Sequence, residues 1–131
     1  MLNYTEKNET HAIRLKDGPE MIGWINLQRG TEEEPGVGIK LFREYRNHGY
    51  GSEAVKLLLN EVHRKYRITR ARVCINRSNH QSQRCFAKLG AVCTGGVPTD
   101  EELSDYKETW PRRRNWDEYG FDIYSIELPI A

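Results

Sequence analysis

Residues 46–52, which read Arg-Asn-His-Gly-Tyr-Gly-Ser, constrain the fold more than any other part of the chain. An apolar run at residues 37–42 precedes them and predicts a strand. Residues 50–66 follow and place apolar side chains at the i, i+3 and i+4 spacing of a core-facing helix. Gly49 and Gly51 can adopt φ > 0 and let the backbone approach a ligand closely. The first N–H groups of a helix have no partner inside it and favour an anion. The pattern therefore predicts a phosphate-binding turn at the start of a helix.

Two common phosphate-binding motifs fit this turn poorly. A P-loop needs Lys followed by Ser or Thr after its last glycine, whereas Ser52 follows Gly51 directly. The spacing Gly49-x-Gly51-x-x-Ala54 formally matches a dinucleotide-binding fingerprint, but no ribose-binding acid stands about 20 residues later. A dinucleotide-binding fragment therefore remains only a minor alternative.

The residues around the glycines carry a family resemblance. Arg46-x-x-Gly49-x-Gly51 resembles the acetyl-CoA loop, Q/R-x-x-G-x-G/A, of the GNAT N-acetyltransferase superfamily. Further on, Asn79 opens a run that reads Asn-x-x-Ser and ends in Lys-Leu-Gly, which is similar to the second signature of that family. The Asn-x-x-Ser variant resembles the branch that acetylates ribosomal-protein N-termini and polyamines. The resemblance covers residues 22–92.

The remaining pattern predicts one α/β domain over residues 1–131, with a GNAT-like mixed, largely antiparallel sheet flanked by helices. Asp-Gly within residues 16–20 predicts a hairpin turn. A second helix is expected to begin at a capping box of Ser78 and Gln81 and to end at Gly90. Further strands are expected at residues 12–15, 21–27, 71–75, 91–94 and 121–128, and a short helix at 99–106.

The two least regular parts of the chain are expected to be residues 1–10, loose or a short edge strand, and an insertion or loop at 95–117. The resemblance implies that the usual N-terminal helices are lacking. These helices form one wall of the acceptor site in the family, so that wall would be missing, supplied by a second subunit or removed. We therefore expect an uncovered apolar surface and a homodimer, with the patch built by Met21, Ile22, Trp24 and Leu58.

Composition excludes several classes of partner. The formal net charge of +1 gives no global field for nucleic acid or membrane, and no apolar run approaches the ~20 residues of a membrane span. The start of the chain lacks the apolar core of a signal peptide, so a cytoplasmic protein is expected. Cys74, Cys85 and Cys93 show no metal-ligand spacing, and we expect buried free thiols and no metal.

The resemblance implies acetyl-CoA as co-substrate. The backbone of Ile39, Lys40 and Leu41 would pair with the pantetheine arm like an added strand. The loop would take the pyrophosphate, with Arg46 adding charge, although Arg46 could also be a simple surface residue. The implied CoA-binding residues are Ile39, Lys40, Leu41, Arg46, Asn47, His48, Gly49, Tyr50, Gly51, Ser52 and Asn79.

The acid and the base are less defined. Many family members place a Tyr seven residues after the signature Asn, but counting from Asn79 gives Phe86, which has no proton to donate and is expected in the core. Water, or direct departure of the thiolate, must then serve. Glu34, together with the neighbouring glutamates 32 and 33, could draw the proton from the amine through water or remain a solvated charge run. Asn79 is either a helix cap or a ligand contact.

Two further motifs are expected to lie on the solvated surface. His80 is expected to be a surface residue rather than a base. Residues 112–114, three successive arginines, are expected in a solvated loop, with the CoA 3′-phosphate or an acidic substrate as their alternative partner. The sequence thus predicts an N-acetyltransferase that moves acetyl from acetyl-CoA to a small-molecule or peptide amine by direct attack in a ternary complex. The main alternative is a non-catalytic acyl-CoA-binding module.

Overall fold

The computed structural model describes residues 8–18, 20–28, 34–96, 100 and 120–131. The helices are the 3-10 turn η1 (Arg43–Tyr45), α1 (Tyr50–Tyr66) and α2 (His80–Ala87). The strands are β1 (Asn8–Arg14), β2 (Met21–Gln28), β3 (Gly36–Leu41), β4 (Arg70–Asn76), β5 (Val92–Cys93) and β6 (Phe121–Glu127). They form a six-stranded sheet in the order β1-β2-β3-β4-β6-β5, in which only the β3–β4 pair is parallel. The predicted fold class is confirmed.

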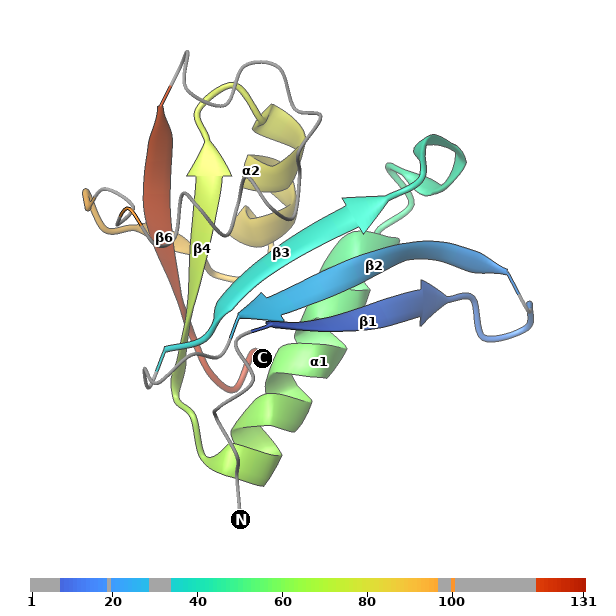
Figure 1. The fold of residues 1–131 in the computed structure, drawn as a ribbon, viewed down its shortest axis with the longest axis horizontal. Helices are drawn as coiled ribbons and strands as arrows, with labels where there is room; N and C mark the ends of the chain where they lie inside the picture. The colour runs from blue at the N-terminus through green and yellow to red at the C-terminus, as the bar shows by residue number, and fades with distance from the viewer. Residues whose placement is uncertain (1–7, 19, 29–33, 97–99, 101–119) are drawn as a thin grey trace.

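The parallel pair of strands is joined only at its beginning. Within the described ranges, β3 and β4 share the single register position Gly36↔Arg72, beside which the N–H of Arg72 donates to the carbonyl of Pro35 at 2.8 Å. Beyond that position the strands diverge, and α2 lies in the opening between their far ends (Figure 1). Each strand keeps a long antiparallel partner on its other side. The sheet is therefore continuous at one end and split at the other.

Helix α1 covers one face of the sheet (Figure 1). The register pairs Ile25 of β2 with Ile39 of β3, so their side chains share the face towards α1. Val55, Leu59 and Val62 of α1 are buried against this core, which confirms the predicted apolar stripe. Helix α1 also begins and ends at the predicted residues. It ends where Arg67 adopts a left-handed backbone conformation, directly after the last residue of the apolar stripe.

The capping box predicted for α2 is wrong. Asn79, and not Ser78, caps the helix, since its Oδ1 accepts the N–H of Ser82 at 3.1 Å. The Ser78 hydroxyl instead donates to Oδ1 of Asn76 at 2.6 Å. Because the Ser78 side chain bonds to Asn76 at the end of β4, the next side chain along the chain, that of Asn79, caps the helix instead. The helix itself ends at Ala87, before a turn.

Element ends differ modestly from the prediction elsewhere. Residues 8–10 belong to β1, which is an edge strand, and residues 1–7 lie outside the described ranges. Strand β5 has only two residues. Gly90 follows the turn after α2 with φ 83°, a conformation that suits glycine. Apart from residue 100, the predicted helix at 99–106 lies outside the described residues, as does most of the 95–117 insertion.

The predicted apolar patch is largely absent. Ile22 is only 1% exposed, Trp24 and Leu58 are half-buried, and Met21 alone of the predicted four is exposed. Phe42 accounts for part of this, because its N–H pairs with the carbonyl of Ile22 at 2.9 Å and its ring packs edge-on against Trp24 at 5.9 Å. The patch that motivated a homodimer is thus smaller than the sequence suggested.

The three thiols are free, but they are not all buried as predicted. Cys74 and Cys85 are half-buried, and Cys93 is exposed, because it stands on the outermost strand, β5. Among the residues that the structure describes, no group of three or more His, Cys, Asp or Glu side chains could hold a metal ion. The same residues include no helix that is long and apolar enough to cross a membrane.

Gly23 offers a test of the β2–β3 contact that positions the split end. A Cβ at Gly23 would overlap the carbonyl oxygen of Lys40 and stand 2.9 Å from Cα of Leu41. Because both are backbone atoms, Gly23→Ala should lower the free energy of unfolding by about 3 kcal/mol. Gly18→Ala is the matched control, since its Cβ would meet only Leu15 at 3.9 Å. Equal urea midpoints for the two variants would contradict the packing described here.

Candidate functional site

A cavity of about 730 Å³ occupies the opening between β3 and β4. Its walls come from β3, the loop before α1, β4 and α2, and its size is typical of a site for a small organic ligand. Beyond Gly36, β3 pairs among the described residues with β2 on one side only, and its other edge faces the cavity, where an extended ligand could lie alongside it. The split in the sheet is therefore also the candidate ligand site.

One end of the cavity is the N-terminus of α1. Gly49 caps the helix with φ 81°, and Asn47 also lies in the left-handed region with φ 65°. The N–H of Glu53 donates to the carbonyl of Gly49 at 3.1 Å. The N–H groups of the first three helical residues therefore have no partner inside the helix. Together with the positive end of the helix dipole, they have the geometry of the phosphate-binding turn that the sequence predicts, and the binding itself stays a prediction.

Gly51 has a packing role that the sequence did not predict, and its predicted close approach to a ligand stays a prediction. A Cβ there would stand 3.2 Å from Cδ1 of Ile39, 3.3 Å from Cδ1 of Leu41 and 3.6 Å from Sγ of Cys85. The missing side chain lets the start of α1 lie close against β3 and α2. Gly51 is thus a packing glycine, whereas Gly49 is the conformational one, with no atom near its absent Cβ.

Arg46 is held in place by the strand that precedes it. Its Nε donates to the carbonyl of Leu41 at 3.0 Å, which leaves the terminal guanidinium nitrogens available at the cavity wall. Nδ1 of His48 lies 2.8 Å from the carbonyl oxygen of Arg46, and the His48 and Tyr50 rings are stacked at 5.3 Å. These contacts give the loop one defined shape without a ligand.

The structure brings most of the predicted CoA-binding residues to one cavity. Those that line it are Ile39, Lys40, Leu41, Arg46, Asn47, Gly49, Gly51, Ser52 and Asn79. His48 and Tyr50 are not among the lining residues; they stack on each other instead. Their predicted role, like that of the whole set, stays a prediction.

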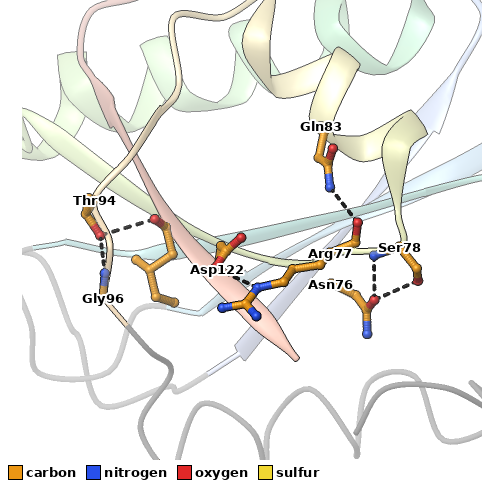
Figure 2. A network of polar contacts seen from close by, with 8 residues as sticks. Asn76, Arg77, Ser78, Gln83, Thr94, Gly96 and Asp122 are labelled. Atoms are coloured by element: carbon orange, nitrogen blue, oxygen red, sulfur yellow. Dashed lines mark hydrogen bonds and ion pairs between the residues drawn. The ribbon is translucent and has the colours of Figure 1, made fainter. Parts of the chain in front are cut away.

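A polar network fixes where α2 begins (Figure 2). Oδ1 of the buried Asn76 accepts both the N–H of Ser78 at 2.9 Å and its hydroxyl at 2.6 Å. Nε2 of Gln83 donates to the carbonyl of Arg77 at 3.0 Å, and Nε of Arg77 bonds to Asp122 of β6 at 3.1 Å. The first turn of α2 is thereby tied to the ends of β4 and β6, beside the cavity.

The charged side chains that line the cavity all have one sign. They are Lys40, Arg46, Arg84 and Lys88, and no carboxylate of the described residues lines it. The sequence analysis missed Arg84 and Lys88. A signal was present, because no Asp or Glu occurs between Glu61 and Asp100, although the whole chain is nearly neutral. This composition favours an anionic ligand.

The structure separates the predicted base from the cavity. Oε1 of Glu34 lies 3.9 Å from Nε of Arg70, and Glu34 is not among the lining residues. Glutamates 32 and 33 lie outside the described ranges. Phe86 is 2% exposed and lines the inner wall, so its predicted place in the core is confirmed. Catalytic roles for Glu34 and Asn79 stay predictions.

These features define an α/β domain with a split sheet and, at the mouth of the split, a helix N-terminus suited to an anion. The model of the acetyltransferase (GNAT) domain family matches residues 2–92. The chain therefore belongs to the GNAT acetyltransferase family, as the two signatures suggested.

Solved structures share the fold at low sequence identity. RimJ from Mycobacterium smegmatis, in complex with CoA-disulfide, is 14% identical with a TM-score of 0.72, over 93% of this chain and 54% of its own. Mutant forms of the spermidine/spermine N-acetyltransferase SpeG from Vibrio cholerae are 10% identical with a TM-score of 0.70, over 94% of this chain and 68% of theirs.

An aminoglycoside acetyltransferase in complex with coenzyme A and kanamycin is 19% identical with a TM-score of 0.67, over 94% of this chain and 68% of its own. The chain thus spans 54% to 68% of the length of these structures. No curated protein sequence matches it. At these identities the likeness shows the fold alone.

The cysteines offer a test of the cavity. Burial raises the pKa of the Cys85 thiol, and the nearby Lys88 opposes this only in part. Less thiolate forms at a given pH, so iodoacetamide should alkylate Cys85 more slowly than the exposed Cys93. The Cys85 rate should keep rising with pH after that of an ordinary thiol has levelled off.

Because Cys85 lines the cavity, added CoA should protect it further and leave Cys93 unchanged. Peptide mass spectrometry measures both rates in the same sample. Protection of Cys93 instead of Cys85 would contradict the assignment of the cavity as the ligand site.

Proposed function

We propose that this chain is an acetyl-CoA-dependent N-acetyltransferase that acts on a primary amine, with residues 1–131 as a single domain. The observation that carries the proposal is the cavity itself. A split sheet edge, a helix N-terminus and four cationic side chains converge on one space, which matches a long ligand with an anionic end. Membership of the GNAT family supports the same conclusion.

Each part of the donor then has a partner in the chain. The backbone of Ile39, Lys40 and Leu41 runs alongside the pantetheine arm like a neighbouring strand, because these residues line the cavity and β4, within the described part of the chain, has diverged from β3 there. The N–H groups of residues 50–52 and the guanidinium of Arg46 bind the pyrophosphate. Oδ1 of Asn79 is used by the helix cap, so its Nδ2 is left to donate to the pantetheine arm or the thioester.

The reaction is direct transfer. The amine nitrogen attacks the carbonyl carbon of the thioester, the C–N bond forms, the C–S bond breaks, and the thiolate leaves with the electron pair. The amine loses a proton, through water, to solvent or to Glu34. Phe86 cannot protonate the thiolate, which departs directly because it is a tolerable leaving group. Positioning of donor and acceptor supplies the main acceleration.

A non-catalytic acyl-CoA-binding module is the second candidate. Phe86 lines the cavity in place of a proton donor, and the described lining residues include no carboxylate. Such a module would bind the donor through the same contacts and release no thiol. The two candidates therefore differ in turnover and not in affinity.

The decisive experiment measures thiol release from acetyl-CoA with a panel of acceptors, together with the mass of the product. The panel holds a peptide with a free N-terminus, a polyamine, an aminoglycoside and lysine. Acetylation of at least one amine is expected. Tight CoA binding with no acetylated product from any acceptor would favour the non-catalytic module, and no CoA binding at all would refute both.

Arg46→Gln should raise the KM for acetyl-CoA at least about tenfold, because a charge-assisted bond to phosphate is lost. Arg43→Gln is the matched control, since Arg43 carries the same charge on the same loop but does not line the cavity. A KM that changes equally in both variants would indicate only long-range electrostatics.

Two substitutions of Phe86 distinguish a structural role from a catalytic role for this residue. Phe86→Tyr should turn over at or above the wild-type rate, because a hydroxyl on the cavity wall could protonate the thiolate. Phe86→Ala should mainly lower the free energy of unfolding, by ~3–5 kcal/mol. A stable Phe86→Ala variant with a specific loss of kcat would contradict the structural role.

The proposal also includes a cellular location and an oligomeric state. The protein acts in the cytoplasm, and a homodimer closes the acceptor site. The smaller apolar patch weakens the second, and light scattering at micromolar concentration tests it. A strict monomer that acetylates amines would show that no partner is needed.

A further inference from the structure

The cavity between β3 and β4 is lined from both faces of the sheet. On one face, a Cβ at Gly51 would meet the side chains of Ile39 and Leu41, so α1 packs on that face. Lys40 alternates with these residues and stands on the other face, where the register pairs it with Trp24. Strand β2 lies one strand away from the split, so Trp24 reaches the cavity through its side chain, which spans β3. A ligand that enters from the face opposite α1 would therefore meet β2.

Asn26 is a buried amide on this same face of β2. It follows Trp24 by two residues and alternates with Ile25 and Leu27, which belong to the core. Asn26 is only 7% exposed, yet in the part of the chain that the structure describes its amide has no hydrogen-bond partner. The other buried asparagine, Asn76, differs in that its Oδ1 accepts two hydrogen bonds. Because a buried amide without a partner destabilises a fold, its presence calls for a ligand.

Asn26 lies beside the place where the proposed donor would end. Strand β3 runs from Gly36 to Leu41, and the pyrophosphate would lie beyond its last residue, at the start of α1. The thioester at the other end of the pantetheine arm would then lie towards the beginning of β3, near Gly38. Gly38 lines the cavity and is the register partner of Asn26. Opposite residues of antiparallel strands are about 5 Å apart, and Gly38 places no side chain between the amide and the cavity.

The chain itself shows what an asparagine of this kind can bind. Oδ1 of Asn60 accepts the N–H of Ile130 at 2.7 Å, and its Nδ2 donates to the carbonyl of the same residue at 3.0 Å. One amide side chain thus satisfies the donor and the acceptor of one residue of extended backbone. A polyamine offers N–H donors but no acceptor, so it would satisfy Oδ1 and leave Nδ2 unpaired.

We propose that Asn26 binds the N–H and the carbonyl of the acceptor's second residue, and thereby selects peptide N-termini over polyamines. This inference rests on the proposed function. The second residue follows the reacting amine by one Cα, which suits the distance of about 5 Å between Gly38 and Asn26. Asn26 is therefore a specificity-determining residue, which contacts the acceptor away from the reacting nitrogen.

Steady-state thiol release at saturating acetyl-CoA tests the assignment with three acceptors: a peptide that begins Ala-Ala, a peptide that begins Ala-Pro, and spermidine. Proline has no backbone N–H, so the second peptide cannot donate to Oδ1 of Asn26. The wild type should show a kcat/KM for the first peptide at least about tenfold above that for either other acceptor. This comparison of substrates needs no variant and stands even where a substitution fails to fold.

Asn26→Leu should turn over the two peptides alike and keep its kcat/KM for spermidine and its Kd for CoA within about twofold. Its thermal midpoint should equal or exceed that of the wild type, because leucine has a similar volume and no amide to leave unpaired. A variant that melts lower and loses activity equally with all three acceptors would overturn the proposal, since it would assign Asn26 to the fold alone.

Thr10→Val is the matched control. Thr10 is the register partner of Asn26 on its other side, shares its face and is exposed, so the substitution removes a polar group from the same row away from the cavity. It should keep the wild-type preference. A wild type that accepts Ala-Pro as well as Ala-Ala, or favours spermidine or another amine over the peptides, refutes the inference and leaves the proposed function standing. A wild type that acetylates no amine refutes the proposed function, and the inference with it.

Discussion

The structure depends on strands β3 and β4, which pair at one register position and then diverge. Gly36 and Arg72 form the single register position between β3 and β4, and the Arg72–Pro35 hydrogen bond secures it. A longer parallel ladder would satisfy more backbone groups, but it would leave no cavity. The split is stable because β2 and β6 hold the outer edges of the two strands and α2 lies in the opening. Among the described residues no strand lies beside the far part of β3 on that edge, which therefore lines the cavity.

The same split explains why both helices bring positive charge to one place. α1 begins where β3 ends, and α2 begins where β4 ends, so the diverging strands deliver the two helix starts to opposite walls of the cavity. Gly51 allows the first turn of α1 to lie close to β3 and α2, since a Cβ there would stand 3.2 Å from Ile39 and 3.6 Å from Cys85. Backbone N–H groups on one wall and side-chain cations on the other therefore face the same cavity. The local acid-free sequence matters more here than the net charge, which is close to zero over the whole chain.

Sequence patterns could predict the elements but not every contact between them. α1 was predicted to its ends because its stripe and its turn are local properties. The cap of α2 was misplaced because the hydrogen bond from Ser78 to Asn76 depends on how β4 ends, which spacing cannot show. Ile22 was expected on the surface because its place in the buried core is decided by packing against residues distant in sequence. Arg84 and Lys88 were overlooked for the same reason, since a cation on a helix becomes informative only once the helix face is placed on a cavity.

The charges also bear on which amine the proposed reaction would favour. A bound CoA carries about four negative charges near neutral pH, and four cations among the described residues line the cavity, so the ternary complex is close to neutral there. No lining carboxylate of the described chain is then left to attract a polycation or to deprotonate an alkyl ammonium. A lysine-like amine, with a pKa of about 10.4, would be almost fully protonated, whereas a peptide α-amino group at about 8 exposes far more of its neutral form. Under the proposed reaction, a site without a strong base in its described wall would favour an amine that gives up its proton to water, and peptide N-termini would then be better acceptors than polyamines.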